Sequence, residues 1–400
     1  MASIKPFRAL RPVPEHARSF SANAFDADSA VAGNDLKAQK KLSQFSYLNI
    51  LNPESSDLKY DSEEAYFQAA KEQLNSALLS GALLDDAQSS VYIYRQAHVG
   101  NVFTGIIALA STAEYRQGKI KRHELTRTDK QQKIAGFFQK VGINGSPVLL
   151  TYPGEAAIKL WLTNSVEKAP DYHFISSRDT EHSLWVVSDE DELENLRTAF
   201  LEIPALYIAD GHHRTASYEL IEEIVPHFMA CFMAEEEVKI FPFHRYLESL
   251  NGIRSSDFFE KLAEVVKVTP LAEAALPAFP GIVHIYMEKK WHKIEFPGKF
   301  KNQPNPKDNL DVSILESEII EKILGFRNIH SGQQITYAGG HLDAAELIKP
   351  VDEGKMQVLF LLYPISSREV RQISDAGETL PPKSTWIEPK MRSGLLIQKF

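Results

Sequence analysis

The stretch from residue 204 to residue 221 limits the fold more than any other part of this 400-residue chain. Its first half is a short apolar run of strand length, and its second half carries helix formers with Leu220 and Ile221 available for a buried face. Only Asp210 and Gly211 separate the two halves, so a strand passes into a helix through one tight turn. The sequence therefore predicts a sheet covered by helices, of the mixed α+β class.

The turn itself, residues 210–214, concentrates polar chemistry. A glycine at the bend lets the backbone approach a ligand, and a helix that starts there presents N–H groups and a positive dipole end to anions. Arg214 adds a planar fork of donors suited to phosphate, and His212 and His213 add donors or proton carriers. Asp210 can cap the helix, bind a metal ion or take a proton. The alternative is an ordinary Asp-Gly turn whose histidines only cap the helix, but the crowding of ionisable groups favours an anion or nucleotide site.

Two earlier segments also carry candidate site residues. Glu15 follows a first strand expected over residues 4–10, and from the residues alone its plain interpretation is a surface acid at a helix start. Residues 119–130 are dense with hydrogen-bond donors, which fits either a solvated, salt-bridged face or a second part of a site. The candidates in this segment are His123, Glu124 and Arg127.

The end of the chain carries two further groups of candidates. Lys383 with the hydroxyl groups of Ser384 and Thr385 can form a compact clamp for phosphate or carboxylate, and the alternative is an exposed loop packed by Trp386. A second polar run follows at residues 390–394. Two isolated residues have simpler interpretations: His182 is expected to be a structural histidine, and the single cysteine, Cys231, a buried core residue.

Composition excludes several classes of protein. One cysteine excludes an internal disulfide and a four-cysteine zinc site. A net charge of -9 argues against broad nucleic-acid binding. No stretch has membrane-spanning length and the start of the chain has no apolar signal core, so we expect a cytoplasmic protein without a membrane partner. Gly-x-Ser-x-Gly, Walker-type and Gly-x-Gly-x-x-Gly motifs are missing from the sequence.

The domain organisation is expected to follow a change of character near residue 250. Residues 1–250 are predicted to form the core that contains the turn, and residues 251–400 a smaller α/β unit. Within that unit, residues 282–287 and 290–296 resemble a hairpin, and residues 310–324 resemble a helix. The final segment, 380–395, is expected to return to the site.

The run at 210–214 after an apolar strand is similar to the phosphate-binding turn of the ParB/sulfiredoxin-like superfamily, in which a Gly-x-x-Arg motif at a helix start grips nucleotide phosphates. The wider chain resembles the bacterial family called domain of unknown function 1015. The matching segments are residues 4–12, 92–96, 121–127, 210–214, 310–315 and 381–386. One segment departs from the pattern, because Ala24, Phe25 and Asp26 stand where relatives usually show Pro-Tyr-Asp.

This resemblance implies a nucleotide-dependent phosphotransferase similar to the free serine kinases, a mixed-sheet core, and ATP or ADP as the phosphate donor. It implies that the phosphates lie on Gly211, His212, His213 and Arg214, that Asp210 and Glu124 hold magnesium, and that Lys383 and Arg127 hold a substrate carboxylate. In the free serine kinases a glutamate just beyond the first strand activates the acceptor hydroxyl, and Glu15 matches that position best. The expected catalytic residues are Glu15, Asp210 and His213, and the expected substrate-binding residues are His123, Glu124, Arg127, Lys383, Ser384 and Thr385.

Two other functions stay open at this point. One is a nucleotide-binding regulatory module with a protein partner, which binds nucleotide without consuming phosphate. The other is a site for a non-nucleotide anion such as a phosphorylated metabolite. The expected partner of an enzyme is a small, serine-like hydroxyl compound, and a homodimer is one option for its assembly.

Overall fold

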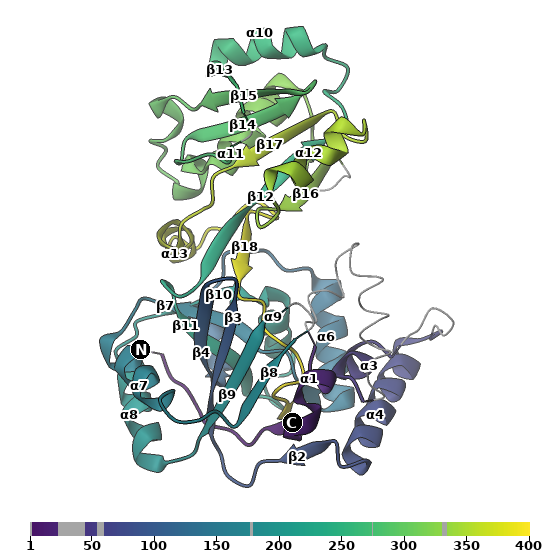
Figure 1. Ribbon diagram of the computed structural model, residues 1–400, viewed down its shortest axis with the longest axis vertical. Helices are drawn as coiled ribbons and strands as arrows, with labels where there is room; N and C mark the ends of the chain where they lie inside the picture. The colour runs from purple at the N-terminus through teal and green to yellow at the C-terminus, as the bar shows by residue number, and fades with distance from the viewer. Residues whose placement is uncertain (1, 23–44, 54–59, 177–178, 274, 330–333) are drawn as a thin grey trace. The chain divides into compact units, whose positions relative to one another are not determined.

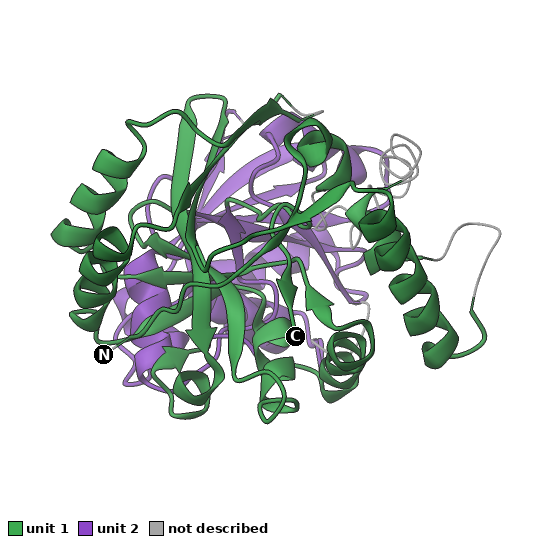
Figure 2. Cartoon of the chain, turned by 90° about the horizontal axis from the view of Figure 1, so that it is seen from below, with its two compact units in different colours: residues 1–122, 126–238, 389–400 green, residues 123–125, 239–388 purple. Residues whose placement is uncertain are grey.

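The computed structural model describes residues 2–22, 45–53, 60–176, 179–273, 275–329 and 334–400. The chain divides into two compact units, which Figure 2 shows in different colours. Unit 1 comprises residues 1–122, 126–238 and 389–400, and unit 2 comprises residues 123–125 and 239–388. Residues 24–26, where the sequence departs from the family pattern, lie outside the described part of the chain.

Unit 1 is built on a mixed sheet (Figure 1). In spatial order the strands of this sheet that the structure describes are β5 (Ile120–Lys121), β10 (Leu206–Asp210), β7 (Val148–Tyr152), β11 (His227–Ala234), β4 (Asn101–Ser111), β3 (Val91–His98), β9 (Glu181–Val187) and β8 (Tyr172–Ile175). β10 runs parallel to β5 and β7 parallel to β11, whereas the other neighbours are antiparallel. The mixed α+β class expected from the sequence is confirmed.

Helices cover one face of this sheet. The described helices of unit 1 are η1 (Pro14–His16), α1 (Ala17–Phe20), α3 (Tyr47–Leu51), α4 (Glu63–Leu79), α5 (Thr112–Arg116), α6 (Thr128–Val141), α7 (Ala156–Ser165), α8 (Glu190–Leu201) and α9 (His212–Glu219). Phe138 of α6, Phe200 of α8 and Tyr218 of α9 share one buried core with Ile106 and Phe232 of the sheet. Burial of aromatic side chains of this size dominates the stabilisation of such a layer. The core fixes the elements on which the turn at 210–214 stands.

The first strand is shorter than the sequence suggests. The structure has β1 at Leu10–Pro12, paired with β2 (Leu83–Asp85), whereas Lys5 and Phe7 form only isolated bridges. The expectation of a strand over residues 4–10 is therefore wrong in its extent. Lys5 pairs with Leu109 and Phe7 with Ser90, so the two bridges have different partners and do not form one continuous ladder.

Unit 2 has its own antiparallel sheet. Its described strands, in spatial order, are β13 (Lys267–Leu271), β15 (Lys290–Glu295), β14 (Ile282–Met287), β17 (Val358–Leu362), β12 (Lys239–Leu247) and β16 (Ile335–Gly339), with β18 (Thr385–Glu388) paired to β12. The expected hairpin is confirmed as β14 and β15.

The described helices of unit 2 are α10 (Ser255–Val265), η3 (Gly298–Phe300), η4 (Pro306–Asn309), α11 (Asp311–Ile314), the π-helix η5 (Leu315–Ile323), α12 (Ala344–Asp352) and α13 (Ser367–Asp375). The helix expected over 310–324 is thus helical throughout, although most of it has π rather than α geometry. Phe258, Leu315 and Phe360 are buried in a core of their own. Unit 2 therefore has the separate hydrophobic core that defines a domain.

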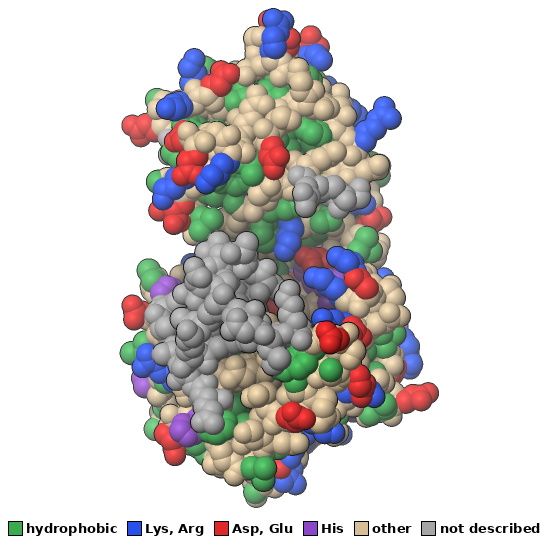
Figure 3. Space-filling view, turned by 90° about the vertical axis from the view of Figure 1, so that its right-hand side faces the viewer, with side chains coloured by type: hydrophobic (Ala, Val, Ile, Leu, Met, Phe, Trp, Pro, Cys, Tyr) green, Lys and Arg blue, Asp and Glu red, His purple; other side chains and the backbone are tan. Residues whose placement is uncertain are grey.

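On the face drawn in Figure 3, acidic and basic side chains of the described residues are interspersed. None of the helices in the described ranges is both long enough and apolar enough to cross a bilayer.

Candidate functional site

The strand-to-helix turn predicted from the sequence is present. β10 ends at Asp210, Gly211 is the N-cap, and α9 begins at His212. The register between β10 and β7 shifts between Ile208 and Asp210, which is a bulge that changes the direction of the Asp210 side chain. We call residues 210–214 the elbow. Asp210 does not cap the helix, because no side-chain cap hydrogen bond is formed there.

Gly211 is required at the elbow for two reasons. Its φ of 97° lies in the left-handed region, which residues with a Cβ rarely adopt. A Cβ at this position would also lie 2.8 Å from Nη2 and 3.0 Å from Nε of Arg214. The guanidinium of Arg214 therefore packs across the glycine, and its buried Nε makes no hydrogen bond to the part of the chain that the structure describes. The guanidinium of Arg214 thus lies in the first turn of a helix with its Nε–H available. Arginine side chains at helix N-termini are suited to binding phosphate.

Asp210 holds this fork in place through two ion pairs. Its Oδ2 accepts a hydrogen bond from Nη2 of Arg214 at 2.8 Å, and its Oδ1 accepts one from Nζ of Lys390 at 2.8 Å. Burial acts to raise the pKa of Asp210, but the charges of Lys390 and Arg214 outweigh burial and the pKa lies below its usual value. Asp210 is therefore a carboxylate at neutral pH, and it orients two cations.

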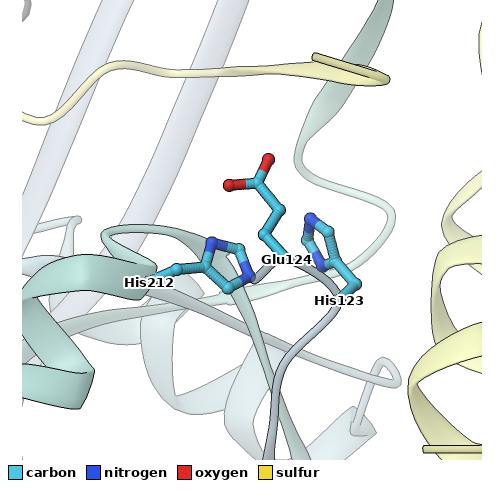
Figure 4. Close-up of side chains that lie close together, drawn as sticks. All are labelled: His123, Glu124 and His212. Carbon is cyan, nitrogen blue, oxygen red and sulfur yellow. The ribbon is translucent and has the colours of Figure 1, made fainter. Parts of the chain in front are cut away.

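His212 and His213 stand on the first turn of α9, where Figure 4 draws the side chain of His212. His212 is 5% exposed, and burial lowers its pKa to about 3. The ring is therefore neutral near pH 7, where it acts as a hydrogen-bonding group rather than a cation. His213 is half-buried.

The helix that presents these residues is anchored to the sheet. Tyr218 of α9 stacks on Phe138 and Phe228, and its hydroxyl accepts a hydrogen bond from Nδ2 of Asn144 at 2.8 Å. This hydrogen bond ties α9 to the segment that follows α6. The anchor limits movement of the first turn, which favours a preorganised binding site.

The side chain of Tyr47 packs closely against Gly145 and Gly394. Its hydroxyl accepts a hydrogen bond from the N–H of Gly145 at 2.7 Å. A Cβ on Gly145 would lie 2.6 Å from the Tyr47 ring, and a Cβ on Gly394 would lie 2.4 Å from its Cβ. Burial raises the pKa of Tyr47, and the charge of Arg214 acts to lower it. Two glycines are thus needed to admit one aromatic side chain, and no short sequence motif reports this.

Glu15 lies on η1, directly after β1, and is exposed. Its strand is fixed by a buried polar network in which Asp86 accepts hydrogen bonds from Nε of Arg11 at 2.7 Å and from the hydroxyl of Tyr92 at 2.6 Å. On the other side of Glu15, Arg392 donates to Oγ of Ser21 at 2.6 Å and to the carbonyl of Arg18 at 2.8 Å. The final segment of the chain therefore contacts both the elbow, through Lys390, and the segment that carries Glu15.

The remaining candidates have other surroundings. Arg127 is the N-cap of α6 and pairs with Asp129 at 2.6 Å on an exposed surface. His123 and Glu124 are consecutive residues on the segment between β5 and α6, and Figure 4 draws their side chains. The carbonyl of His123 accepts a hydrogen bond from the N–H of Leu380 at 2.8 Å, so this segment and the approach to residues 381–385 lie together within unit 2.

Residues 383–385, the predicted clamp, contact one aromatic ring and several backbone groups. Nζ of Lys383 lies 5.3 Å from the ring centre of Phe243, and Oγ of Ser384 donates to the carbonyl of Pro381 at 2.6 Å. Thr385 begins β18 and pairs with Pro242. Arg245 donates to the carbonyl of Lys383 at 2.7 Å and so fixes the segment.

Sequence reasoning identified the elbow but gave no role to Lys390 or Arg392. Both lie in the polar run 390–394 that was singled out, yet their partners are 180 and 371 residues away in the chain. A lysine followed by an arginine near the end of a chain is an ordinary charged pair. Only the fold shows what these two cations contact.

The fold and the elbow define a mixed-sheet protein in which a strand passes into a helix through one tight turn. The family model described as "Protein of unknown function (DUF1015)" matches residues 4–313. The chain therefore belongs to this family, which confirms the family expected from the motifs.

Relatives of known activity are distant. The ATP-dependent L-serine kinase of Staphylothermus marinus is 27% identical over 180 residues, which are 44% of this chain and 64% of that protein. The match thus spans less than two thirds of the relative. Among solved structures, a C-terminally truncated SbnI from Staphylococcus aureus is 14% identical with a TM-score of 0.39, covering 73% of this chain and 86% of that one. A free serine kinase mutant in complex with AMP is 15% identical with a TM-score of 0.38, covering 72% and 92%.

Proposed function

We propose that this protein transfers a phosphoryl group from ATP or ADP to the hydroxyl of a small, serine-like substrate. The observation that carries the proposal is the guanidinium of Arg214, which lies across Gly211 at a helix start with an unused Nε donor. The distant relation to an ATP-dependent L-serine kinase supports the same reaction class. Phosphoryl transfer needs positioning and charge neutralisation more than a covalent nucleophile, and the elbow supplies both.

In the proposed reaction the terminal phosphate of the nucleotide binds to Gly211, His212, His213 and Arg214. The oxygen of the acceptor hydroxyl forms a bond to that phosphorus, and the bond between the phosphorus and the bridging oxygen breaks. The proton of the hydroxyl passes to the carboxylate of Glu15, and the negative charge on the leaving nucleotide is balanced by Arg214 and Lys390. His213 donates a hydrogen bond to the transferred group. The products are a phosphomonoester and the shortened nucleotide.

Asp210 was expected to hold magnesium, and its surroundings do not fit that role. Each of its oxygens accepts a hydrogen bond from a cation, so a metal ion bound there would face both Lys390 and Arg214. Divalent cations need carboxylate oxygens that are available as ligands. We assign Asp210 instead to orienting the two cations, and no step of the proposed reaction runs through a metal at this residue.

The substrate side of the proposal retains His123, Glu124, Arg127, Lys383, Ser384 and Thr385 as candidate binding residues. Lys383 has a positive φ of 54°, a conformation that its neighbours must enforce. Strain of this kind is frequent at functional sites, and here it favours a binding role for the segment over a plain surface loop.

The test is phosphorus NMR of the purified chain with ATP or ADP, with and without magnesium, and with L-serine or other small hydroxyl compounds. We expect a new phosphomonoester signal with L-serine that is lost in Arg214→Gln and kept in Arg116→Gln, an exposed arginine of the same unit. Nucleotide binding without transfer to any acceptor would instead support a regulatory module. If no nucleotide binds, the proposal fails.

A further inference from the structure

A second polar cluster lies in unit 1 around His182, on β9. This histidine is 4% exposed, and its ring stacks on Tyr94 of β3 and tilts against Phe174 of β8. Its Nδ1 lies 2.9 Å from the hydroxyl of Tyr94, whereas its buried Nε2 makes no hydrogen bond to any described residue. The sequence predicts a structural histidine, and the contact with Tyr94 accounts for one of its two ring nitrogens.

The free nitrogen of His182 becomes a donor in one of the two tautomers of the ring. Burial lowers the pKa of His182 to about 3, so the ring is neutral near pH 7 and carries one proton. We assign that proton to Nε2, so that Nδ1 accepts the hydrogen bond from the Tyr94 hydroxyl. A buried donor without an acceptor costs about 1–3 kcal/mol, so its retention calls for an explanation.

Arg392 approaches the same cluster from the end of the chain. Its guanidinium lies 5.3 Å from the ring centre of Phe174, whose ring centre is 5.0 Å from that of His182. Its hydrogen bonds go to Ser21 and to the carbonyl of Arg18, through Nε and Nη2. These partners are neutral, and within the described residues Arg392 has no carboxylate to balance its charge. Burial lowers the pKa of Arg392, and the charge of Arg18 acts in the same direction.

The cluster is connected to the elbow. Gln96 is the cross-strand partner of His182, and its Nε2 donates to the carbonyl of Lys390 at 3.0 Å. The side chain of Lys390 in turn reaches Asp210. Residues 390–392 therefore connect the elbow to the His182 cluster within unit 1. The partly buried guanidinium of Arg392 and the buried Nε2 of His182 lie at the far end of this segment.

We propose that Arg392 and His182 form the subsite for the carboxylate of the substrate. Nη1 of Arg392 and Nε2–H of His182 supply the donors, and Tyr94 and Phe174 form the aromatic walls. A carboxylate provides the counter-charge for Arg392 and the acceptor for Nε2–H of His182 that no described residue supplies. This inference rests on the proposed function for the identity of the substrate as a small hydroxyl compound, and it assigns the carboxylate to residues other than Lys383 and Arg127.

The experiment measures ligand binding without turnover. Saturation-transfer NMR titrations compare L-serine with ethanolamine, and D-glycerate with ethylene glycol, because each pair differs only by the carboxylate. We expect the wild-type chain to bind the carboxylated member of each pair more tightly by about 10- to 100-fold, the range for a hydrogen bond to a charged group. Arg392→Gln and His182→Phe should each remove most of this preference and leave ethanolamine binding unchanged.

Two controls keep the result clear. Arg95→Gln removes another arginine of the same sheet that also stacks on an aromatic ring, Trp185, and it should keep the preference. Because Arg392 also holds Ser21 and Arg18, its variant is checked by thermal unfolding, and if it does not fold, His182→Phe decides the question. A carboxylate preference that survives His182→Phe, or that the wild-type chain lacks, overturns the subsite. ADP binding of the wild-type chain is measured in a separate titration. If the wild-type chain does not bind ADP but keeps its preference for carboxylated ligands, the proposed kinase reaction is contradicted and the carboxylate subsite is not.

Discussion

Nζ of Lys390 lies 2.8 Å from Oδ1 of Asp210, although 180 residues separate them in the chain. The contact ties the last segment of unit 1 to the elbow, and it gives Asp210 two cationic partners instead of one. An aspartate held between a lysine and an arginine is a poor metal ligand and a good organiser of positive charge. The chemistry of the elbow follows from this pair.

The first prediction concerns the pH dependence of stability. The pKa of Asp210 is below its usual value in the fold, since Lys390 and Arg214 outweigh the effect of burial. A carboxyl group whose pKa is lowered by folding stabilises the folded state above its unfolded pKa of about 3.9, and this contribution is lost as the pH falls further. Urea unfolding between about pH 5 and pH 3, roughly one unit to either side of that value, should show a shallower loss of stability for Asp210→Asn than for the wild type.

The control for this prediction is Asp191→Asn, which changes an exposed aspartate on α8. It should follow the wild-type curve. Parallel curves for the wild type and Asp210→Asn across the whole range would contradict the ion pairs at the elbow.

The second prediction separates two effects of a side chain at Gly211. Gly211→Ala should lower the free energy of unfolding by about 1 kcal/mol because of its positive φ. It should also weaken ADP binding, since its Cβ would displace the guanidinium of Arg214. Gly118→Ala is the matched control, with a φ of 74° and nothing within 4 Å of the added carbon. Equal ADP affinity in the two variants would show that the packing of Arg214 on Gly211 does not matter for binding.

The third prediction concerns the buried ion pair of unit 2. Arg245 is fully buried and donates to Oε1 of Glu316 at 3.1 Å, as well as to the carbonyls of Phe243 and Lys383. Arg245→Met leaves a buried carboxylate with one cation fewer, and such changes cost roughly 3–5 kcal/mol. Chemical denaturation should show this loss, whereas Arg254→Met, in an exposed pair with Asp257, should change stability by less than about 1 kcal/mol. A small effect for Arg245→Met would mean that the pair is not buried in solution.

The fourth prediction uses the single cysteine. Cys231 is fully buried on β11, which confirms the interpretation from sequence, and burial raises the pKa of its thiol. The reactive form is the thiolate, so the folded chain should not react with Ellman's reagent near pH 8. Reaction should appear only in denaturant, at the midpoint at which unit 1 unfolds. Fast reaction of the native chain would contradict the packing of Cys231 against Gly105.

The elbow could be predicted from sequence because all its determinants lie within one short stretch. The strand, the glycine and the helix follow one another directly in the sequence. A glycine between a strand and a helix indicates a left-handed backbone conformation, which Gly211 has. Lys390 and Arg392 could not be assigned, since their partners, Asp210 and Ser21, are distant in the chain. The same holds for the unused nitrogen of His182, because burial of one ring atom has no sequence signal. The early strand was overextended because Lys5 and Phe7 pair with different segments, Leu109 and Ser90, which the local sequence does not show.

The last prediction tests the base of the proposed reaction. Glu15→Gln removes the carboxylate that accepts the hydroxyl proton but keeps the size and polarity of the side chain. General base catalysis contributes about 10²- to 10⁴-fold, so turnover should fall by that factor while the Kd for ADP stays unchanged. Glu63→Gln is the control, because Glu63 is another exposed glutamate in the first turn of a helix of unit 1. Glu15 is exposed on η1, where its replacement disturbs no buried contact, so a loss of turnover cannot be ascribed to unfolding. Full turnover of Glu15→Gln, with Arg214→Gln inactive, would leave the elbow as the phosphate site and require a base from another segment.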